Sequence, residues 1–272
     1  MPADLHVHTY YSDGLLSPEA VVAKAAENKL ATMAITDHDI VAGIDPAAAE
    51  GAVKDVKIIP GIELTAESND AEIHILGYFL DYHNAALLEV LQKIQQDREE
   101  RIGKIVNNLK AVGVHLETEA ILESSKPGTV GRPHVARMLI AKGYAQDFKE
   151  AFMKFLVKGQ PGYVPHYRLD PVEAVRLIRS CKGAAVFAHP ALSKSDALIP
   201  TLVEAGMAGL EAFHASHNFY TEQKYVKLAE QYNLVVTGGT DFHGGGGLNE
   251  MPLGTKFTSD ENVQKLKERA DG

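Results

Sequence analysis

The sequence predicts an α/β fold, a barrel-like domain that carries a helical insertion. Short apolar and β-branched runs recur along the chain with helical patterns between them, and strands that alternate with helices form crossover units in a mostly parallel sheet. One stretch after the fourth run keeps a helical pattern throughout. With 272 residues, the chain can bury one large core.

Seven runs are expected to be strands, and two of the helices between them are well marked. Ser17 can cap a helix that has Pro18 in its first turn, and residues 171–180 place apolar side chains on one face. We expect the strands at residues 5–7, 32–36, 56–63, 71–79, 184–188, 209–213 and 234–240.

The region between the fourth and fifth expected strands has a different pattern. From Leu87 to Leu109, apolar residues recur three and four positions apart and "QQDREER" places charges on the other side, which indicates one long amphipathic helix. More helical stretches follow before "KGQPGYVP" ends the pattern. We therefore expect a helical insertion at residues 84–165, within a barrel formed by residues 1–83 and 166–272.

Composition excludes several classes of protein. Lys and Arg total 27 against 36 Asp and Glu, so the formal charge of -9 provides no basic field for a long nucleic acid. The single cysteine, Cys181, excludes an intramolecular disulfide and a Cys-rich zinc site. No apolar run approaches the ~20 residues that span a bilayer. Because the first expected strand begins so early, we expect no secretory leader. We expect a cytoplasmic protein without a membrane partner.

Histidines and carboxylates follow the expected strands at the point where each one ends. Because the carboxyl ends of parallel barrel strands form one rim, these side chains are expected to meet there. Each residue alone has an ordinary explanation: a lone histidine is usually structural, and Asp13 before a glycine can be turn chemistry. Residues of this kind lie in or directly after all seven expected strands: His6, His8, Asp37, His38, Glu63, His74, His189, Glu211, His214, Asp241 and His243.

The donor types favour an open metal site. Residues two apart in a strand share a side, so His6 and His8 can face one ion through neutral ring nitrogens. Carboxylates can bridge two cations, and a set rich in histidine suits Mn, Fe or Zn better than Mg or Ca. Since thiolates are lacking, a closed structural zinc site is not expected.

Six motifs in this order resemble the polymerase and histidinol phosphatase (PHP) domain family over nearly the whole chain: "DLHVHTYYSDG", "AITDHD", "PGIELTA", "IHILGYF", "AVFAHP" and "GTDFH". The resemblance implies a distorted seven-stranded (β/α)7 barrel with a trinuclear metal centre. It implies one ion on His6, His8, Glu63 and Asp241, a second on Glu63, His74 and His189, and a third on Asp13, His38 and His243. We expect two or three divalent ions, Mn first, with Fe or Zn as alternatives.

Within that family, the chain looks most like stand-alone bacterial enzymes whose helical insertion caps the substrate. "GTVGRPHVARML" is the distinguishing stretch. The resemblance implies removal of the 3′-phosphate from nucleoside 3′,5′-bisphosphates, and trimming of short 5′-phosphorylated RNA. The alternatives are a small-metabolite monophosphatase, such as one acting on histidinol phosphate, and a non-catalytic module that binds metal or nucleic acid.

The expected chemistry is phosphoester hydrolysis with a metal-bridging hydroxide as nucleophile, so that no serine or cysteine is needed. Glu63 would set the metal spacing and act in catalysis together with Asp241. His214 or His217 would bind phosphate or act as general acid. Arg132 is expected to contact phosphate in a bidentate manner, and His134 to bind substrate or donate a proton, although "GRPH" can equally be a simple helix start.

Overall fold

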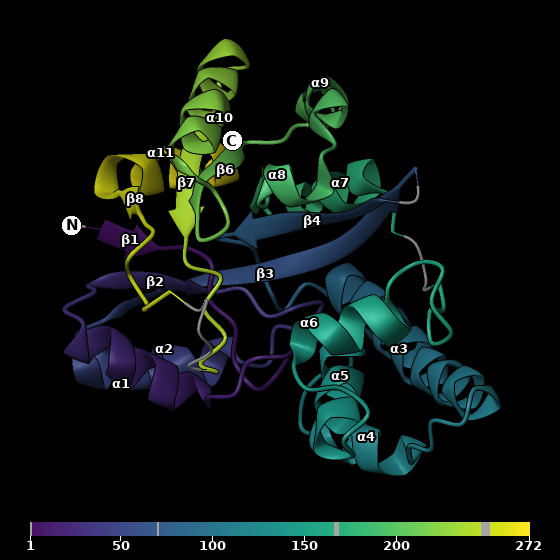
Figure 1. Ribbon diagram of the computed structural model, residues 1–272. Coiled ribbons are helices and arrows are strands. Elements are labelled where there is room, and N and C mark those ends of the chain that lie inside the picture. Colours follow the sequence, from purple (N-terminus) through teal and green to yellow (C-terminus); the bar gives the residue numbers. More distant parts are fainter. Residues whose placement is uncertain (1, 70, 166–168, 246–250) are drawn as a thin grey trace.

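The computed structural model describes residues 2–69, 71–165, 169–245 and 251–272. It confirms an α/β fold in which a strongly curved sheet is surrounded by helices and a separate group of helices lies at one side (Figure 1). The sheet has eight strands in the order β7-β6-β5-β4-β3-β2-β1-β8. Its strands are β1 (Pro2–Asp4), β2 (Thr32–Ile35), β3 (Lys57–Ser68), β4 (Ala71–Tyr78), β5 (Ala184–Phe187), β6 (Gly209–His214), β7 (Val235–Gly239) and β8 (Thr258–Ser259).

The expected count of seven strands was wrong by one, because the two-residue strand β8 pairs with β1 in antiparallel fashion. The pairings confirm a mostly parallel sheet, with one exception besides β8. Strand β4 runs antiparallel to both β3 and β5, whereas the remaining neighbours among β1 to β7 are parallel. Only residues 69 and 70 separate β3 from β4, so the chain turns back directly and makes a long hairpin. As a result, Glu63 lies in the middle of β3 and not at its end.

The sheet nearly closes because the segment after β1 meets the segment after β7. The Leu5 amide donates to the Gly238 carbonyl at 3.1 Å, and the His8 amide donates to the Phe242 carbonyl at 2.9 Å. On the other side, the Thr36 amide donates to the carbonyl of Val7 at 2.9 Å. Residues 5–7, which the sequence predicts as the first strand, therefore follow β1 and form only an isolated bridge.

Four of the described barrel helices begin at a residue whose side chain caps them. Helix α1 (Pro18–Glu27) is capped by Ser17, whose hydroxyl accepts the amide of Ala20 at 3.2 Å, as expected. Asp170 caps α7 in the same way. The helices outside the insertion are completed by α2 (Ile44–Lys54), α7 (Pro171–Ser180), α8 (Pro190–Ser193), η2 (Asp196–Leu198), α9 (Ile199–Glu204), α10 (Phe219–Gln231) and α11 (Asp260–Asp271). No helix in the described ranges is both long and apolar enough to cross a membrane.

The predicted insertion consists of helices that share an apolar cluster. The long helix α3 (Ala85–Ala111) packs its first half on the barrel core through Leu87 and Leu91, and its second half on the other insertion helices through Ile105 and Leu109. The others are α4 (Thr118–Ser124), α5 (Arg132–Ala141), α6 (Phe148–Ala151) and a π-helical turn, η1 (Phe152–Leu156). The division at 84–165 stays a proposal, and its second boundary adjoins residues 166–168, which lie outside the described residues.

Gly239 allows the barrel to close tightly beside the hollow that the strand ends surround. A Cβ atom on Gly239 would lie 2.4 Å from the backbone nitrogen of His6. Both contacting segments are backbone, so neither can shift without a cost in free energy. We predict that Gly239→Ala lowers the free energy of unfolding by about 1–3 kcal/mol, as overpacking does. Gly103→Ala is the matched control, since nothing lies within 4 Å of its Cβ and the helix should gain about 1 kcal/mol. Urea unfolding of both variants measures this, and equal effects would contradict the steric argument.

Candidate metal centre

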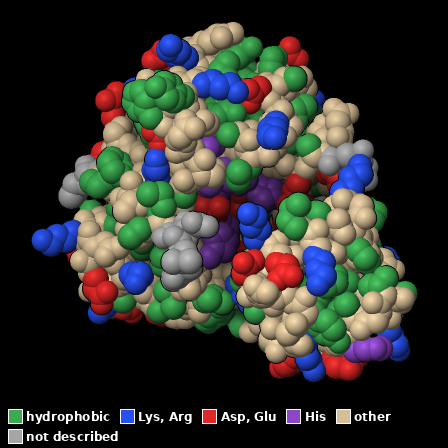
Figure 2. All heavy atoms as spheres, in the orientation of Figure 1, with side chains coloured by type: hydrophobic (Ala, Val, Ile, Leu, Met, Phe, Trp, Pro, Cys, Tyr) green, Lys and Arg blue, Asp and Glu red, His purple; other side chains and the backbone are tan. Residues whose placement is uncertain are grey.

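All nine side chains proposed as metal ligands from the sequence lie around one hollow between the barrel and the insertion. Figure 2 shows histidine and acidic side chains gathered at the bottom of this hollow, with Lys or Arg side chains beside them. Segments from both ends of the chain meet here because the sheet closes on itself. The nine are His6, His8, Asp13, His38, Glu63, His74, His189, Asp241 and His243, and they form overlapping groups whose ligand atoms lie within 4.8 Å of one another.

Glu63 occupies the middle of the cluster, and its side chain is 1% exposed. Its Oε2 atom lies 3.2 Å from His6 Nε2, 3.3 Å from His8 Nε2 and 3.1 Å from His38 Nδ1. Its Oε1 atom lies 2.8 Å from His74 Nδ1 and 3.0 Å from His189 Nε2. The two carboxylate oxygens thus face different imidazole groups, which is the arrangement a bridging carboxylate requires.

Asp241 and Asp13 are the other two carboxylates of the cluster, and both lie near His8 and His243. Asp241 Oδ1 lies 3.4 Å from His6 Nε2 and 3.1 Å from His8 Nε2. Asp13 Oδ1 lies 3.1 Å from His243 Nε2, while its Oδ2 is 4.0 Å from His38 Nε2. Asp13 is therefore grouped with His243 and His38, and also with His8, whereas Asp241 is grouped with the His-x-His pair.

The imidazoles keep the central carboxylates ionised. Burial by itself would raise the pKa of Glu63, but the surrounding histidines, His38 foremost, hold that pKa well below its ordinary value. The pKa values of Asp13 and Asp241 are also held low against burial, mainly by His243 and His6 respectively. Three carboxylates that stay charged in a buried site are ready to coordinate cations.

Several donor atoms in the hollow are buried and lack hydrogen-bond partners. They include one ring nitrogen each of His6, His8 and His38, together with Glu63 Oε2 and Asp13 Oδ1. A buried polar atom without a partner costs free energy, so such atoms in one place need an explanation. Their convergence, the nitrogen and oxygen donor types, and the negative carboxylates fit a cluster of divalent ions.

Glu211 and Asp37 orient the His-x-His pair; an orienting role for Asp37 or Asp39 is expected from the sequence, because they flank His38, whereas that of Glu211 is not. Glu211 Oε1 lies 3.1 Å from His6 Nδ1, which keeps the proton on that atom and turns Nε2 toward the hollow. For His8, Nδ1 lies 3.4 Å from the Ser12 hydroxyl, and that hydroxyl donates to Asp37 at 2.6 Å. A histidine whose other nitrogen is held in this way is typical of metal sites.

Backbone strain also marks the site. His189 has φ of 26° and Asp241 has φ of 53°, in the left-handed region that residues with a Cβ adopt at a cost. Asp39, which follows the proposed ligand His38, has the same φ of 53°. Strained residues persist when the surroundings fix them, and they concentrate at functional sites.

His214 and His217 lie at the side of the cluster near Asp241. The His214 Nδ1 atom accepts the Ser216 amide at 3.1 Å, so Nε2 carries the proton of the neutral ring and faces Asp241 Oδ2 at 3.4 Å. His217 donates from Nδ1 to the Ala212 carbonyl at 2.9 Å, and its ring stacks on Tyr225. His217 therefore lies behind His214 and not against the proposed ligands. The catalytic roles of both histidines stay predictions.

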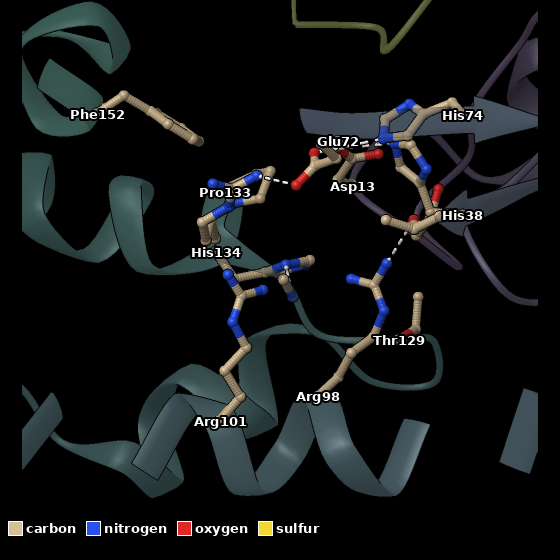
Figure 3. Close-up of a pocket in the computed structure, with 14 residues that line it drawn as sticks. Asp13, His38, Glu72, His74, Arg98, Arg101, Thr129, Pro133, His134 and Phe152 are labelled. Carbon is tan, nitrogen blue, oxygen red and sulfur yellow. Dashed lines mark hydrogen bonds and ion pairs between the residues drawn. The ribbon is translucent and has the colours of Figure 1, made fainter. Parts of the chain in front are cut away.

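Arg132 and His134 line a pocket of about 200 Å³ above His38 and His74. In Figure 3 the side chains of α3 and α5 face Asp13, Glu72 and the two histidines across this space. Arg132 pairs with Glu72 at 2.6 Å, and Glu72 in turn lies 3.3 Å from His74. Burial and then the charge of Arg137 lower the pKa of His134 to about 4, so this ring is neutral at pH 7. We call this space the arginine pocket.

Two further arginines in the pocket were missed from the sequence. Arg98 on α3 pairs with the buried Asp39 and donates to Thr65 Oγ1 at 3.0 Å. Arg101, one turn later, is 5% exposed; its Nε donates to the Val164 carbonyl at 2.7 Å, while its Nη2 has no hydrogen-bond partner. Both occur in "QQDREER", where their charge fits equally well on the solvated face of a helix.

Comparison with known proteins places the chain among phosphoesterases. A family model described as PHP domain matches residues 4–160. A 3′,5′-nucleoside bisphosphate phosphatase of Chromobacterium violaceum is 33% identical over 89% of this chain and 87% of its own. The 5′-3′ exoribonuclease Rnm of Escherichia coli is 33% identical over 88% of this chain and 84% of its own. A phosphoribosyl 1,2-cyclic phosphate 1,2-diphosphodiesterase of Eggerthella lenta is 32% identical over 90% and 95%.

Two solved structures resemble the whole molecule. A Bifidobacterium adolescentis protein, provisionally described as a metal-dependent phosphoesterase, has a TM-score of 0.91 and 28% identity, covering 98% of this chain and 96% of its own. An amidohydrolase from Chromobacterium violaceum with bound sulfate and no metal has a TM-score of 0.89 and 30% identity with the same coverage. The barrel and the insertion both lie within these matches.

We predict that the metal-free protein loses stability as the pH rises above neutrality. Burial opposes the charged forms, but Glu63 and Glu72 raise the pKa of His74 to about 10, and Asp13 and Asp241 raise that of His243 to about 10. A histidine whose pKa is raised in the folded state stabilises the fold fully below its unfolded-state pKa of 6.5. This stabilisation is lost as the pH rises from there through about 10.

Thermal unfolding after chelation, from pH 6 to pH 10, should therefore show a falling Tm. His74→Gln should flatten the profile, whereas His83→Gln, at an exposed position, should leave it unchanged. An unchanged Tm across this range in the metal-free protein would show that these imidazoles are not held in their charged form.

Proposed function

The chain belongs to the PHP domain family, and from this membership we propose that it is a metal-dependent hydrolase that releases phosphate from nucleotides. The observation that carries the proposal is the convergence of buried, unpartnered donor atoms on Glu63 in a hollow open to a cationic pocket. The rival reading is a non-catalytic module that binds metal or nucleic acid; the net charge of -9 disfavours a long nucleic acid, and phosphate release distinguishes the enzyme from a module that only binds metal.

We propose the 3′-phosphate of nucleoside 3′,5′-bisphosphates as the preferred substrate group, with short 5′-phosphorylated RNA as a second substrate. The names of two relatives support this pair of activities. Both reactions break the same kind of bond. Water adds to phosphorus, the bond from phosphorus to the 3′-oxygen breaks, and the 3′-oxygen takes up a proton. Only the group that leaves with the phosphate differs, since it is hydrogen in one case and the next nucleotide in the other.

We propose two or three divalent ions, Mn first, with Fe or Zn as alternatives. His6, His8, Glu63 and Asp241 would hold one ion; Glu63, His74 and His189 a second; Asp13, His38 and His243 a third. When bound, such ions activate water near neutral pH and neutralise charge on a phosphoryl group. To bind an ion, the His74 ring would have to give up a proton that now lies between it and Glu63 or Glu72.

The arginine pocket is the proposed subsite for the second phosphate. Arg101 brings a buried guanidinium nitrogen without a partner to this space, and Arg98 and Arg132 bring charges already paired with carboxylates. Planar guanidinium groups bind phosphate oxygens in a bidentate manner. The sulfate in the Chromobacterium violaceum structure is consistent with a fold that accepts a tetrahedral anion.

The histidines at the rim have separate proposed roles. His134 Nδ1 accepts the Gly131 amide at 3.2 Å, so the neutral ring carries its proton on Nε2 and can donate a hydrogen bond to substrate. His214, which faces Asp241, is placed to orient that carboxylate or to bind phosphate. Burial lowers the pKa of His217, and its Nδ1 proton is already donated to a carbonyl, so a positioning role suits it better than that of a general acid.

Phosphate release from a substrate panel tests the proposed function. With Mn added, we expect adenosine 3′,5′-bisphosphate or a 5′-phosphorylated short RNA to be preferred over histidinol phosphate, mononucleotides and a ribose cyclic phosphate. Glu63→Gln should lower kcat by at least about 100-fold and reduce the number of bound metal ions. Preference for histidinol phosphate would favour the small-metabolite alternative. Full activity of Glu63→Gln would overturn the metalloenzyme proposal.

Arg101→Met tests the second-phosphate subsite, because Met keeps an apolar stem but removes the guanidinium. We predict that it raises KM for adenosine 3′,5′-bisphosphate about tenfold or more, since a charged hydrogen bond contributes ~1.5–3 kcal/mol. Adenosine 3′-phosphate lacks the second phosphate, so its KM should change less than about twofold. An equal rise for both substrates would indicate a general structural effect.

A further inference from the structure

We infer that a second pocket, beside the metal centre and separate from the arginine pocket, holds the nucleotide that follows the scissile phosphate in a single-stranded oligonucleotide. This inference rests on the proposed function and extends it to a strand-binding subsite. The pocket has a volume of about 320 Å³, and we call it the exit pocket. Its lining includes Tyr10, Leu15, Lys126, His134, Arg137 and Met138.

The exit pocket adjoins the metal centre through the loop that carries Asp13. Tyr10 and Leu15 belong to the same loop, and His134 lines both the exit pocket and the arginine pocket. A substrate whose 5′-phosphate occupies the arginine pocket and whose 3′-phosphate lies at the metal centre therefore has the exit pocket as a neighbouring space. The inorganic phosphate of a bisphosphate needs no such space, whereas a continuing strand does.

Arg137 brings a positive charge to the exit pocket. Its Nη2 donates to the backbone carbonyl of Asp13, and its guanidinium lies 5.8 Å from the ring centroid of Phe148. The carboxylate whose charge acts on Arg137 is that of Asp13, which itself lies 3.1 Å from His243 Nε2. A half-buried guanidinium next to a proposed metal ligand is suited to a phosphodiester group.

The rest of the lining suits a nucleobase and a second backbone contact. Tyr10 is part-exposed and its ring lies 4.9 Å from that of Tyr11. Leu15, at 53% exposed, and Met138 add apolar surface. Lys126 is exposed and paired only at the surface with Glu123, so it can turn toward a phosphate. Aromatic faces with adjoining cations bind single strands without reading their sequence.

Activity on two substrates tests the exit pocket. The probes are adenosine 3′,5′-bisphosphate and a 5′-phosphorylated pentanucleotide, assayed with Mn at low and high salt. We expect Tyr10→Ala and Lys126→Ala each to lower kcat/KM for the pentanucleotide about fivefold or more, while that for the bisphosphate stays within about twofold. The loss from Lys126→Ala should shrink at high salt. Arg137 is not substituted, because its bond to Asp13 supports a proposed ligand.

Lys265→Ala is the matched control, since Lys265 is an exposed lysine of α11 that pairs with a glutamate four residues away. It should change neither activity. If the variants lower both activities equally, or if the wild type hydrolyses the bisphosphate but not the pentanucleotide, the exit pocket is overturned while the proposed function stands. If neither substrate is hydrolysed, the proposed function fails.

Binding provides a readout that does not depend on turnover. The anisotropy of a 3′-fluorescein-labelled, 5′-phosphorylated pentanucleotide is measured with EDTA present, so that ions in the metal centre do not contribute. Tyr10→Ala and Lys126→Ala should raise Kd about fivefold or more, and Lys265→Ala should not. Equal Kd values for all four proteins would overturn the inference even if hydrolysis is observed.

Discussion

The Glu63 carboxylate is the constraint on which the rest of the structure depends. A negative charge that is 1% exposed persists only where neighbouring groups compensate it, and here five imidazoles from different strands and loops face its two oxygens. The pKa values of His6 and His74 are raised by Glu63 and other carboxylates against burial. The long hairpin of β3 and β4 brings His74 across from Glu63, and the closing contact between the ends of β1 and β7 brings His6 and His8 to it. The shape of the barrel thus serves to gather ligands around one side chain.

The contact between the barrel and the insertion also depends on a buried carboxylate with a nitrogen partner. Arg98 from α3 pairs with Asp39, which is fully buried in the loop after β2, and the Thr129 amide donates to the Tyr11 carbonyl at 2.7 Å. Breaking a buried pair leaves an uncompensated charge, so this contact strongly fixes where the insertion lies. The arginine pocket therefore has a defined position over His38 and His74, and the insertion is more than a loosely attached cover.

Much of this arrangement was predictable because it depends on local pattern. Alternation placed His6 and His8 together, and the strand-end position of His38, His189 and Asp241 indicated one rim. The pattern could not predict contacts across the chain: Glu211 behind His6, Arg98 on Asp39 and Arg101 on the Val164 carbonyl all join residues far apart in the sequence. The strand β8 was missed because two residues are too few to show a periodic pattern. The antiparallel direction of β4 was missed because the composition of a strand does not indicate its direction.

The joining of His6 and His8 to Asp241 has a consequence for synthesis of the protein. Segments near opposite ends of the chain must meet before the centre is complete, and contacts of such long sequence separation form late because their loop must close first. A ribosome-bound chain that still lacks the region around Asp241 and His243 cannot present the full set of donors. Completion of the proposed metal site is thereby delayed until the region around Asp241 has folded, and a truncated product would not carry the complete set of proposed ligands.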